Sequence, residues 1–455
     1  MNFTFPEGFL FGCASSACQV ESGVHEGGKG EDATDHYREI YPEKYGYCDP
    51  EQSADFYHKY PEDIRLMKEL GLRAFRFSIS WSRIFPKGPD EVCQTGLDYY
   101  SDMIDKFREA GIVTFFDLWH CDLPYWVIER GGVANREFID WFTRYAEVCF
   151  KAFGDRVDYW CTVNEPSINV FSAYAQGVQA PFIEDIDLAF VATHNMLIAH
   201  YKTIKLYKSF GFKGKIGAVI HHQPTYAHAI SEKDLHSVDV REAFYSGLWL
   251  DPMLRGHYPK LLTDIEYVRR KLPEGYESEL RENFIENDYI AINYYAPLYA
   301  GYRENDHSDY RAELEYTTYQ NPALSKDDYG FSSYAEGLYD TVMDLAERYP
   351  GKEIIITENG IGKSKWGNYE EEVKDDYRIN YLREHLLSVS RACKAGAPLK
   401  GYFHWSFLDT NELYVCGYKF MFGLVQVRYD REDRLRVPRD SFYYYQSVIK
   451  NNKVQ

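Results

Sequence analysis

The stretch PEDIRLMKELGLRAFRFSI (residues 61–79) contains the unit from which the fold can be built. Its first part, Pro61–Leu70, has the pattern of an amphipathic helix, with Pro61 suited to the first turn and Gly71 to the C-cap. Its second part, Ala74–Ile79, is a short apolar run typical of a buried strand. A helix that leads directly into a strand indicates a βα architecture.

Similar units continue along the whole chain. Helix-like runs such as Leu188–Ser209 separate further strand-like runs, and no linker or repeat interrupts them. The other strand candidates are Phe9–Ala14, Val113–Leu118, Tyr159–Val163, Lys215–Ile220, Tyr289–Asn293, Glu353–Thr357 and Gly401–Trp405. Eight strands with helical crossovers predict an α/β fold, a single (β/α)8 TIM barrel with residues 1–455 as one domain. Insertions such as Tyr45–Ser53 and Tyr302–Tyr329 are expected as long polar loops on its C-terminal face.

Composition limits the possible partners. The net charge of −19 argues against nucleic acid and anionic membranes, because both require a basic surface. No run of about 18 apolar residues suggests a membrane span. The 41 Tyr, 28 Phe and 8 Trp either fill a large core or include stacking platforms for a sugar, and composition leaves both open.

The cysteines and the first residues bear on location. Nine scattered cysteines without a CxxC motif suit reduced thiols better than a disulfide framework. Met1–Phe11 has neither a basic region nor a long apolar core, so we expect no signal peptide and a cytoplasmic protein. The sequence does not predict an oligomeric state.

Polar side chains follow most of the predicted strands. Each has a structural interpretation alone: Arg76 could be a buried ion-pair partner, and His120 a core histidine. Together they favour a functional face, because barrel enzymes place their active sites at the C-terminal ends of the strands. These residues are Gln19, Arg76, His120, Asn164, Glu165, Asn293, Tyr295, Glu358, Asn359 and Trp405.

Two glutamates stand out within this set. Glu165 lies in Thr-Val-Asn-Glu-Pro (162–166), and Glu358 lies in Ile-Ile-Thr-Glu-Asn-Gly (355–360). They follow the fourth and seventh predicted strands, so they can face each other across the barrel mouth. Glycoside hydrolysis needs such a pair, one carboxyl to protonate the leaving oxygen and one to attack the sugar. Pro166 and Gly360 are expected to end the strands and turn the chain.

The chain resembles glycoside hydrolase family 1, the β-glucosidase family, over nearly its whole length. The motifs are Phe-Pro-Glu-Gly-Phe-Leu-Phe-Gly (5–12), Met67–Pro86, Gly-Leu-Asp-Tyr-Tyr (96–100), Asn-Tyr-Tyr (293–295) and the two glutamate motifs. The resemblance implies a (β/α)8 barrel, hydrolysis of a small β-glycoside with retention of configuration, and no cofactor or metal. It also implies roles for single residues. Glu165 would be the acid/base, and Glu358 would be the nucleophile, held by Arg76 and Tyr295. Asn164 would bind the 2-hydroxyl of the sugar, and Trp405 would form the floor of the glycone site. Further substrate-binding residues would be Gln19, His120, Asn293 and Glu412.

The chain departs from this family at two pocket positions. His120-Cys121-Asp122 stands where the family usually has His-Trp-Asp, and Thr410-Asn411-Glu412-Leu413 stands where it has Asn-Phe-Glu-Trp. Cys121 and Leu413 therefore replace two indole donors, and we expect an altered glycone pocket.

A phosphorylated sugar is a less suitable substrate. The segment from Asp409 to Gly423 has the length found in the phospho-β-glucosidase branch, but that branch's phosphate-binding Ser, Lys and Tyr fall on Glu412, Phe420 and Phe422. A carboxylate and two phenyl rings cannot hold a phosphate dianion, although Lys419 and Arg428 are nearby in sequence.

Two other functions remain as alternatives: a sugar-binding barrel of low activity, and a β-glycosidase for a substituted or non-glucose glycone. A metal site at His221-His222, after the fifth strand, lacks a second group of ligands at suitable spacing, so this pair is interpreted as part of a loop.

Overall fold

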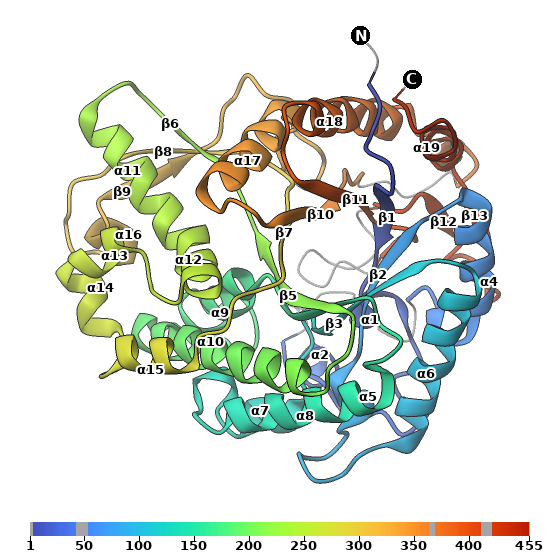
Figure 1. The fold of residues 1–455 in the computed structure, drawn as a ribbon, viewed down its shortest axis with the longest axis horizontal. Coiled ribbons are helices and arrows are strands. Elements are labelled where there is room, and N and C mark those ends of the chain that lie inside the picture. The colour runs from blue at the N-terminus through green and yellow to red at the C-terminus, as the bar shows by residue number, and fades with distance from the viewer. Residues whose placement is uncertain (1–2, 42–52, 364–368, 411–420, 455) are drawn as a thin grey trace.

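The computed structural model describes residues 3–41, 53–363, 369–410 and 421–454. Eight parallel strands close into a barrel, and they follow one another around it in chain order, as predicted (Figure 1). The barrel strands are β1 (Leu10–Ala14), β2 (Ala74–Ser78), β3 (Val113–Trp119), β4 (Tyr159–Asn164), β5 (Lys215–His221), β7 (Tyr289–Asn293), β10 (Glu353–Asn359) and β11 (Leu399–Trp405). Each agrees with a predicted strand to within two residues at either end.

Alternation along the strands separates the barrel interior from the helix layer. In β2, Phe75 and Phe77 belong to the large hydrophobic cluster beneath the helices, whereas Ala74 belongs to the small cluster inside the barrel. Because side chains alternate with a period of two, Arg76 follows Ala74 into the barrel. The same rule in β3 puts Asp117 on the side of Phe115. Both polar residues therefore reach the barrel mouth.

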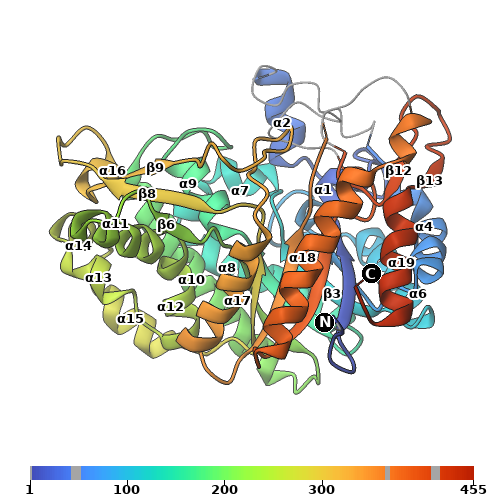
Figure 2. The same cartoon turned by 90° about the horizontal axis from the view of Figure 1, so that it is seen from above.

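A ring of helices covers the barrel. Figure 2 shows α17, α18 and α19 along its outside. The main crossover helices are α4 (Phe56–Leu70), α6 (Gln94–Glu109), α8 (Phe138–Phe153), α10 (Ile186–Ser209), α12 (Leu248–Arg255), α17 (Ala335–Arg348), α18 (Asp376–Lys394) and α19 (Asp440–Asn451). Shorter helices are α1 (Ala17–Val20), α2 (Ala33–Ile40), α5 (Trp81–Ile84), α7 (Tyr125–Glu129), α9 (Pro166–Tyr174), α11 (Glu232–Glu242), α13 (Lys260–Asp264), α14 (Glu266–Lys271), α15 (Tyr276–Asn283) and α16 (Tyr310–Glu313).

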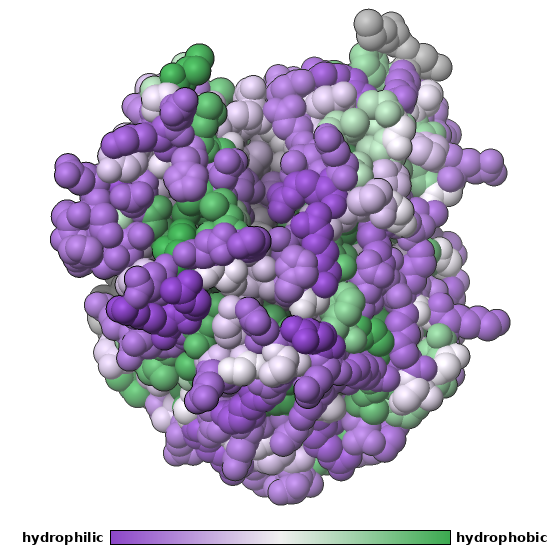
Figure 3. Space-filling view, turned by 60° about the vertical axis from the view of Figure 1, so that its left-hand side comes forward, coloured by the Kyte–Doolittle hydropathy of each residue, from purple (hydrophilic) through white to green (hydrophobic). Residues whose placement is uncertain are grey.

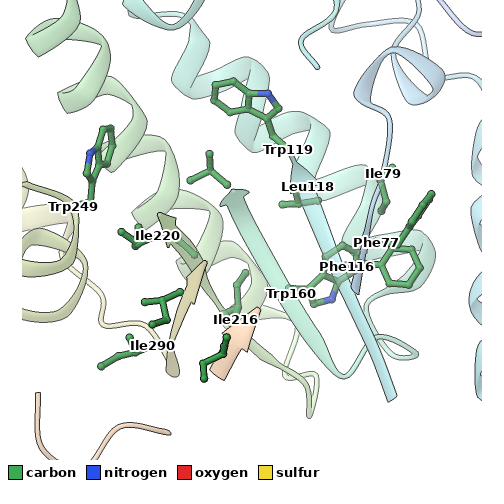
Figure 4. Close-up of a cluster of buried hydrophobic side chains, with 14 of the residues drawn as sticks. Phe77, Ile79, Phe116, Leu118, Trp119, Trp160, Ile216, Ile220, Trp249 and Ile290 are labelled. Carbon is green, nitrogen blue, oxygen red and sulfur yellow. The ribbon is translucent and has the colours of Figure 1, made fainter. Parts of the chain in front are cut away.

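The core lies mainly between the strands and these helices. In Figure 4, Phe77, Phe116 and Trp160 project from neighbouring strands and Trp249 comes from α12. All four belong to one continuous hydrophobic cluster and are fully buried. Much of the aromatic content thus fills the core, which rigidly supports the strand ends.

One helix begins earlier than its sequence signal. Pro61 was expected in the first turn, but α4 begins at Phe56, so Pro61 lies inside the helix. The fully buried Phe56 packs on Phe77 with ring centroids 4.9 Å apart, and this tertiary contact extends the helix in the N-terminal direction. The other end is as predicted, because Gly71 caps the helix with φ 80°, a left-handed conformation suited to glycine.

The insertion at Tyr302–Tyr329 is more ordered than the predicted loop. It contains α16 and β9 (Tyr316–Tyr319), and β9 joins a small sheet with β6 (Thr225–Ala227) and β8 (Leu298–Tyr302). Near the C-terminus, β12 (Val425–Val427) pairs with β13 (Arg436–Pro438). The other predicted insertion, Tyr45–Ser53, lies almost entirely outside the described residues.

The visible surface agrees with the charge of the chain. On the face in Figure 3, hydrophilic residues dominate and hydrophobic ones form small separate groups. Among the helices described by the structure, none is long and apolar enough to cross a membrane.

Candidate active site

A strand irregularity directs Glu358 into the barrel mouth. The pairing of β10 with β7 shifts between Ile356 and Glu358, so Glu358 comes opposite Asn293. Such a bulge turns a side chain out of strict alternation. The carboxylate is buried, and each of its oxygens has a donor: Arg76 Nη1 at 2.6 Å from Oε1, and Tyr295 Oη at 2.7 Å from Oε2.

Glu165 is held by a turn at the end of β4. The pairing of β4 with β5 is irregular just before it, and Glu165 itself adopts φ 45°. Pro166 then begins α9, so the strand stops where the sequence predicted. Asn293 Nδ2 donates to Glu165 Oε1 at 2.8 Å. Three features thus fix the side chain: the left-handed backbone of Glu165 itself, the start of α9 directly after it, and the hydrogen bond from Asn293.

The guanidinium of Arg76 connects its own strand, β2, to three others. It forms two contacts with Asp117, Nε to Oδ1 at 3.0 Å and Nη2 to Oδ2 at 2.6 Å. Nη2 also donates to Asn164 Oδ1 at 2.7 Å, while Nη1 reaches Glu358. An apolar core could not supply partners for the N–H groups of a buried arginine. This polar network supplies them, and it holds the guanidinium against the Glu358 carboxylate. Asp117 was not singled out in the sequence, because its partner lies on another strand.

A cavity of about 260 Å³ opens between the two glutamates. Its lining contains eight of the predicted site residues, while Arg76 and Asn293 are not part of the lining and connect to it through their hydrogen bonds to the glutamates. We call it the central pocket. It is lined by Gln19, His120, Cys121, Asn164, Glu165, Ile168, Asn169, His221, Tyr295, Tyr329, Phe331, Glu358, Trp405 and Phe422.

One wall of the central pocket is aromatic. Trp405, the last residue of β11, stacks with His120, with ring centroids 5.6 Å apart and planes 12° apart. Tyr295 stacks on Phe331 with centroids 5.2 Å apart. Flat rings beside polar groups suit a ligand that has both apolar C–H faces and hydroxyls.

The pocket environment changes the ionisation of both glutamates. Burial raises the pKa of Glu358, and the Arg76 charge and the Tyr295 hydroxyl oppose that shift, while Glu165 adds to it. Burial also raises the pKa of Glu165, against its bond from Asn293 and the charges of His120 and Arg76. The two carboxyls therefore share one desolvated site, but the hydrogen bonds and charges that favour ionisation differ between them.

Several pocket residues were not anticipated. His221 is the last residue of β5 rather than part of a loop, and its Nδ1 lies 2.8 Å from the hydroxyl oxygen of Tyr245. Burial lowers the pKa of His221 to about 4, so it lines the pocket as a neutral ring. Tyr329 is the last residue of the long insertion and Phe331 follows it, and only the position of this segment on the active face could have indicated them.

Two predicted pocket residues, Glu412 and Leu413, lie outside the described residues. The other departure from the resembling family, Cys121, does line the central pocket. Its Sγ lies 2.7 Å from Sγ of Cys18, and both cysteines are adjacent in sequence to predicted sugar-binding residues, Gln19 and His120.

Comparison with known proteins agrees with this geometry. The sequence model of Glycosyl hydrolase family 1 matches residues 1–454. The chain belongs to glycosyl hydrolase family 1. It is 36% identical to beta-glucosidase A of Thermotoga maritima over 452 residues, which is 99% of each protein. The solved structure of the family 1 b-glucosidase from Thermotoga maritima superposes with a TM-score of 0.93 at 35% identity, covering 99% of each chain.

A relative named for a different substrate also matches. The chain is 32% identical to 6-phospho-beta-glucosidase GmuD of Bacillus subtilis, over 97% of each protein. The predicted family, barrel and enzyme class are confirmed: the protein is a retaining β-glycosidase of family 1, with glucosidase relatives. The alternative of a mere sugar-binding barrel is therefore set aside.

Proposed function

We propose that Glu358 is the nucleophile and Glu165 the general acid/base in a two-step hydrolysis of β-glucosides. The observation that carries this assignment is the unequal number of donors: both oxygens of Glu358 accept a hydrogen bond, from Arg76 and Tyr295, while Glu165 receives one from Asn293. A nucleophile must be ionised and an acid must be protonated, so the better-stabilised carboxylate takes the first role.

In the first step, Glu358 attacks the anomeric carbon while Glu165 gives its proton to the leaving oxygen. The bond to the aglycone breaks as the glycosyl–enzyme bond forms. In the second step, Glu165 removes a proton from water, which attacks the anomeric carbon and releases Glu358. Two inversions give net retention, in agreement with the class of the enzyme.

The sugar-binding roles follow from the remaining free atoms. Asn164 Oδ1 already accepts from Arg76 and Asn293, and its Nδ2 lies 3.3 Å from Nε2 of His120. The amide has a second N–H, which is a donor suited to the 2-hydroxyl. Gln19 and His120 line the same pocket and supply further polar contacts, and Trp405 forms the floor. The cavity of about 260 Å³ suits one sugar ring and therefore an exo-acting enzyme.

We propose a neutral rather than a phosphorylated glycone. The described lining of the central pocket contains no lysine or arginine, and Phe422 occupies part of it. Arg428, a nearby cation in sequence, is bound to Asp430 through two nitrogens at 2.8 and 2.7 Å. A phosphate dianion would therefore find no cation among these residues, although the name of the Bacillus relative includes a phosphosugar.

The assignment is tested with two substitutions. Glu358→Gln should remove measurable turnover of both activated and unactivated aryl β-glucosides, because no nucleophile remains. Glu165→Gln should slow substrates with poor leaving groups by about 10²–10⁴-fold, and spare the first step on activated aryl substrates, which need little protonation. The release of β-glucose first, followed by NMR, supports retention through this pair.

If Glu165→Gln abolishes turnover of every substrate equally while Glu358→Gln depends on the leaving group, the two roles must be exchanged. Circular dichroism should show unchanged folding in both variants, since each replaces an oxygen with an amide of the same shape.

We also propose a cytoplasmic role in carbohydrate metabolism. Seven cysteines lie in the described residues, and all are free thiols. Free thiols suit a reducing compartment. Fractionation of the source cells should find the activity with cytoplasmic markers; activity in the culture medium would contradict this location.

A further inference from the structure

Three potential metal ligands meet beside the central pocket, and one of them, Cys121, lines it. Cys18 lies on α1, while Cys121 and Asp122 follow β3, so about a hundred residues separate the two cysteines in sequence. The ligand atoms of all three residues lie within 4.8 Å of one another. It is the one such group of three or more among the described residues, and no sequence spacing could have indicated it.

The carboxylate in this group lacks a partner. Asp122 is 2% exposed, and neither of its oxygens accepts a hydrogen bond from another described residue. Burial, together with the negative charge of Asp32, raises the pKa of Asp122 to about 7. A buried carboxyl without donors is costly, and a cation is the partner that removes that cost.

The surroundings are negative. Besides Asp32, Glu21 also disfavours ionisation of Asp122, and the nearby Lys29 opposes them. The ammonium of Lys29, however, is already bound to Asp32 at 2.9 Å and to Asp35. A divalent cation would therefore enter a site with excess negative potential.

The two sulfurs determine the kind of cation. Thiolate ligands prefer Zn²⁺ and similar soft metals, and a mixed set of two sulfurs and one oxygen suits tetrahedral Zn²⁺ with its fourth position open. Burial raises the pKa of the Cys18 thiol, and the hydrogen bond with Cys18 together with burial raises the pKa of the Cys121 thiol. Binding would release both thiol protons to solvent as two S–Zn bonds form.

We propose that Cys18, Cys121 and Asp122 form a binding site for a thiophilic divalent cation such as Zn²⁺ beside the central pocket. With Zn–S bonds of about 2.3 Å, tetrahedral geometry places the sulfurs roughly 3.8 Å apart, so they must separate from the present 2.7 Å. A Cys18–Cys121 disulfide is the competing chemistry. The metal is favoured because a disulfide would leave the buried Asp122 carboxylate unpartnered.

Metal binding should reach the substrate site through sequence neighbours. Cys121 lines the central pocket itself, Gln19 follows Cys18 and His120 precedes Cys121. Fixing both cysteines on one ion moves the backbone that carries two sugar-contacting residues. We therefore expect Zn²⁺ to inhibit the β-glycosidase.

The primary experiment measures binding without substrate. The full-length protein, reduced and freed of metal with a chelator, is titrated with Zn²⁺ against a chromogenic competitor. The wild type should bind one equivalent, and Cys18→Ser, Cys121→Ser and Asp122→Asn should each bind at least about tenfold more weakly. Cys393→Ser, which removes a half-buried thiol on α18, is the matched control and should bind as the wild type does.

Spectroscopy and activity complete the test. Co²⁺ in place of Zn²⁺ should give thiolate-to-metal charge-transfer absorption in the wild type and in Cys393→Ser, and lose it in Cys18→Ser. For each protein, aryl β-glucoside hydrolysis is compared with and without Zn²⁺. Zn²⁺ should lower the rate of the wild type and of Cys393→Ser but not that of Cys18→Ser. Since binding is read without turnover, its failure says nothing against the catalytic assignment.

Two results would overturn the proposal. One is equal Zn²⁺ affinity in Cys18→Ser, Asp122→Asn and Cys393→Ser. The other is a Cys18–Cys121 disulfide that mass spectrometry finds in protein purified under reducing conditions. Asp122→Asn retains both thiols, so it tests the site even where a cysteine variant fails to fold.

Discussion

Each glutamate of the pair has its own donor residues, and these can be removed separately. Tyr295 donates to Glu358, and Asn293 donates to Glu165. Both bonds favour the ionised carboxylate and lower its pKa, against the rise caused by burial. The two limbs of the pH profile should therefore respond independently to two substitutions.

Tyr295→Phe should move the acid limb of kcat/KM to higher pH. Glu358 must be ionised, so activity is lost as pH falls through its pKa. Removing the phenol donor raises that pKa, and the loss then begins at a higher pH. The profile is measured with an aryl β-glucoside; an unmoved acid limb would contradict the role of Tyr295.

Asn293→Ala should move the alkaline limb to higher pH. Glu165 must be protonated, so activity is lost as pH rises through its pKa. Without the amide donor the pKa rises, and the acid form persists further. Asn293 also contacts Asn164, so kcat/KM should fall overall while the limb shifts. A shift to lower pH would show that Asn293 stabilises the protonated form instead.

Cys121 is the residue with the clearest bearing on specificity. An indole there would add volume and an N–H donor beside His120, so Cys121→Trp should narrow the pocket and reward a hydroxyl that the native enzyme ignores. We expect the native enzyme to accept a 4- or 6-substituted glucoside, galactoside, fucoside, xyloside or glucuronide better, relative to plain glucoside, than the variant does. Identical ratios across this panel would exclude an altered pocket.

At the scale of elements, two strand irregularities aim the glutamates. The pairing of β4 and of β10 with their neighbours shifts just before Glu165 and Glu358, respectively. Gly360 belongs to the same arrangement: a Cβ on it would lie 1.9 Å from the carbonyl oxygen of Trp405. The glycine is thus needed because β10 and β11 approach closely, rather than only to turn the chain, as the sequence suggested.

Gly360→Ala should therefore separate Glu358 from the pocket floor. We expect a loss of about 1–3 kcal/mol in unfolding free energy, measured in urea, together with a lower kcat. Gly88→Ala is the control, since its added Cβ meets only Arg130 Nη2 at 3.6 Å, an ordinary contact. Equal effects of the two substitutions would contradict the argument from close approach.

These elements also show what sequence could predict. The barrel strands were predictable because each is a short buried apolar run, and Glu165 and Glu358 because each follows such a run. Partnerships across strands were not: the contact of Arg76 with Asp117 and the meeting of Cys18 with Cys121 depend on barrel closure. The start of α4 and the strand in the long insertion were missed because tertiary packing, not local pattern, creates them.

At the scale of the whole molecule, buried ion pairs fasten the last helix to the barrel. Arg439, which precedes α19, forms bonds of 2.8 and 2.9 Å with both carboxylate oxygens of Asp409, beyond β11. Both residues are buried. We propose on this basis, and from the closure of the barrel, that residues 1–455 act as one domain.

Arg439→Met should destabilise that unit as a whole. Removing one partner leaves Asp409 buried and uncompensated, at a cost of about 3–5 kcal/mol. Arg431→Met, which breaks the exposed pair with Asp433, should leave the thermal unfolding midpoint unchanged. A local loss of order near α19 without a change in the unfolding of the barrel would argue against a single domain.

The closure of β1 on β11 has a consequence for the order of synthesis. Leu10 pairs with Gly401, and Thr4 bridges to Lys453 near the chain termini in Figure 1. On the ribosome, at about 5–20 residues per second, β1 waits on the order of half a minute for its second neighbour. During that wait one edge of a hydrophobic parallel sheet is open to any passing strand, so the nascent chain, rather than the finished enzyme, is the form most in need of a chaperone.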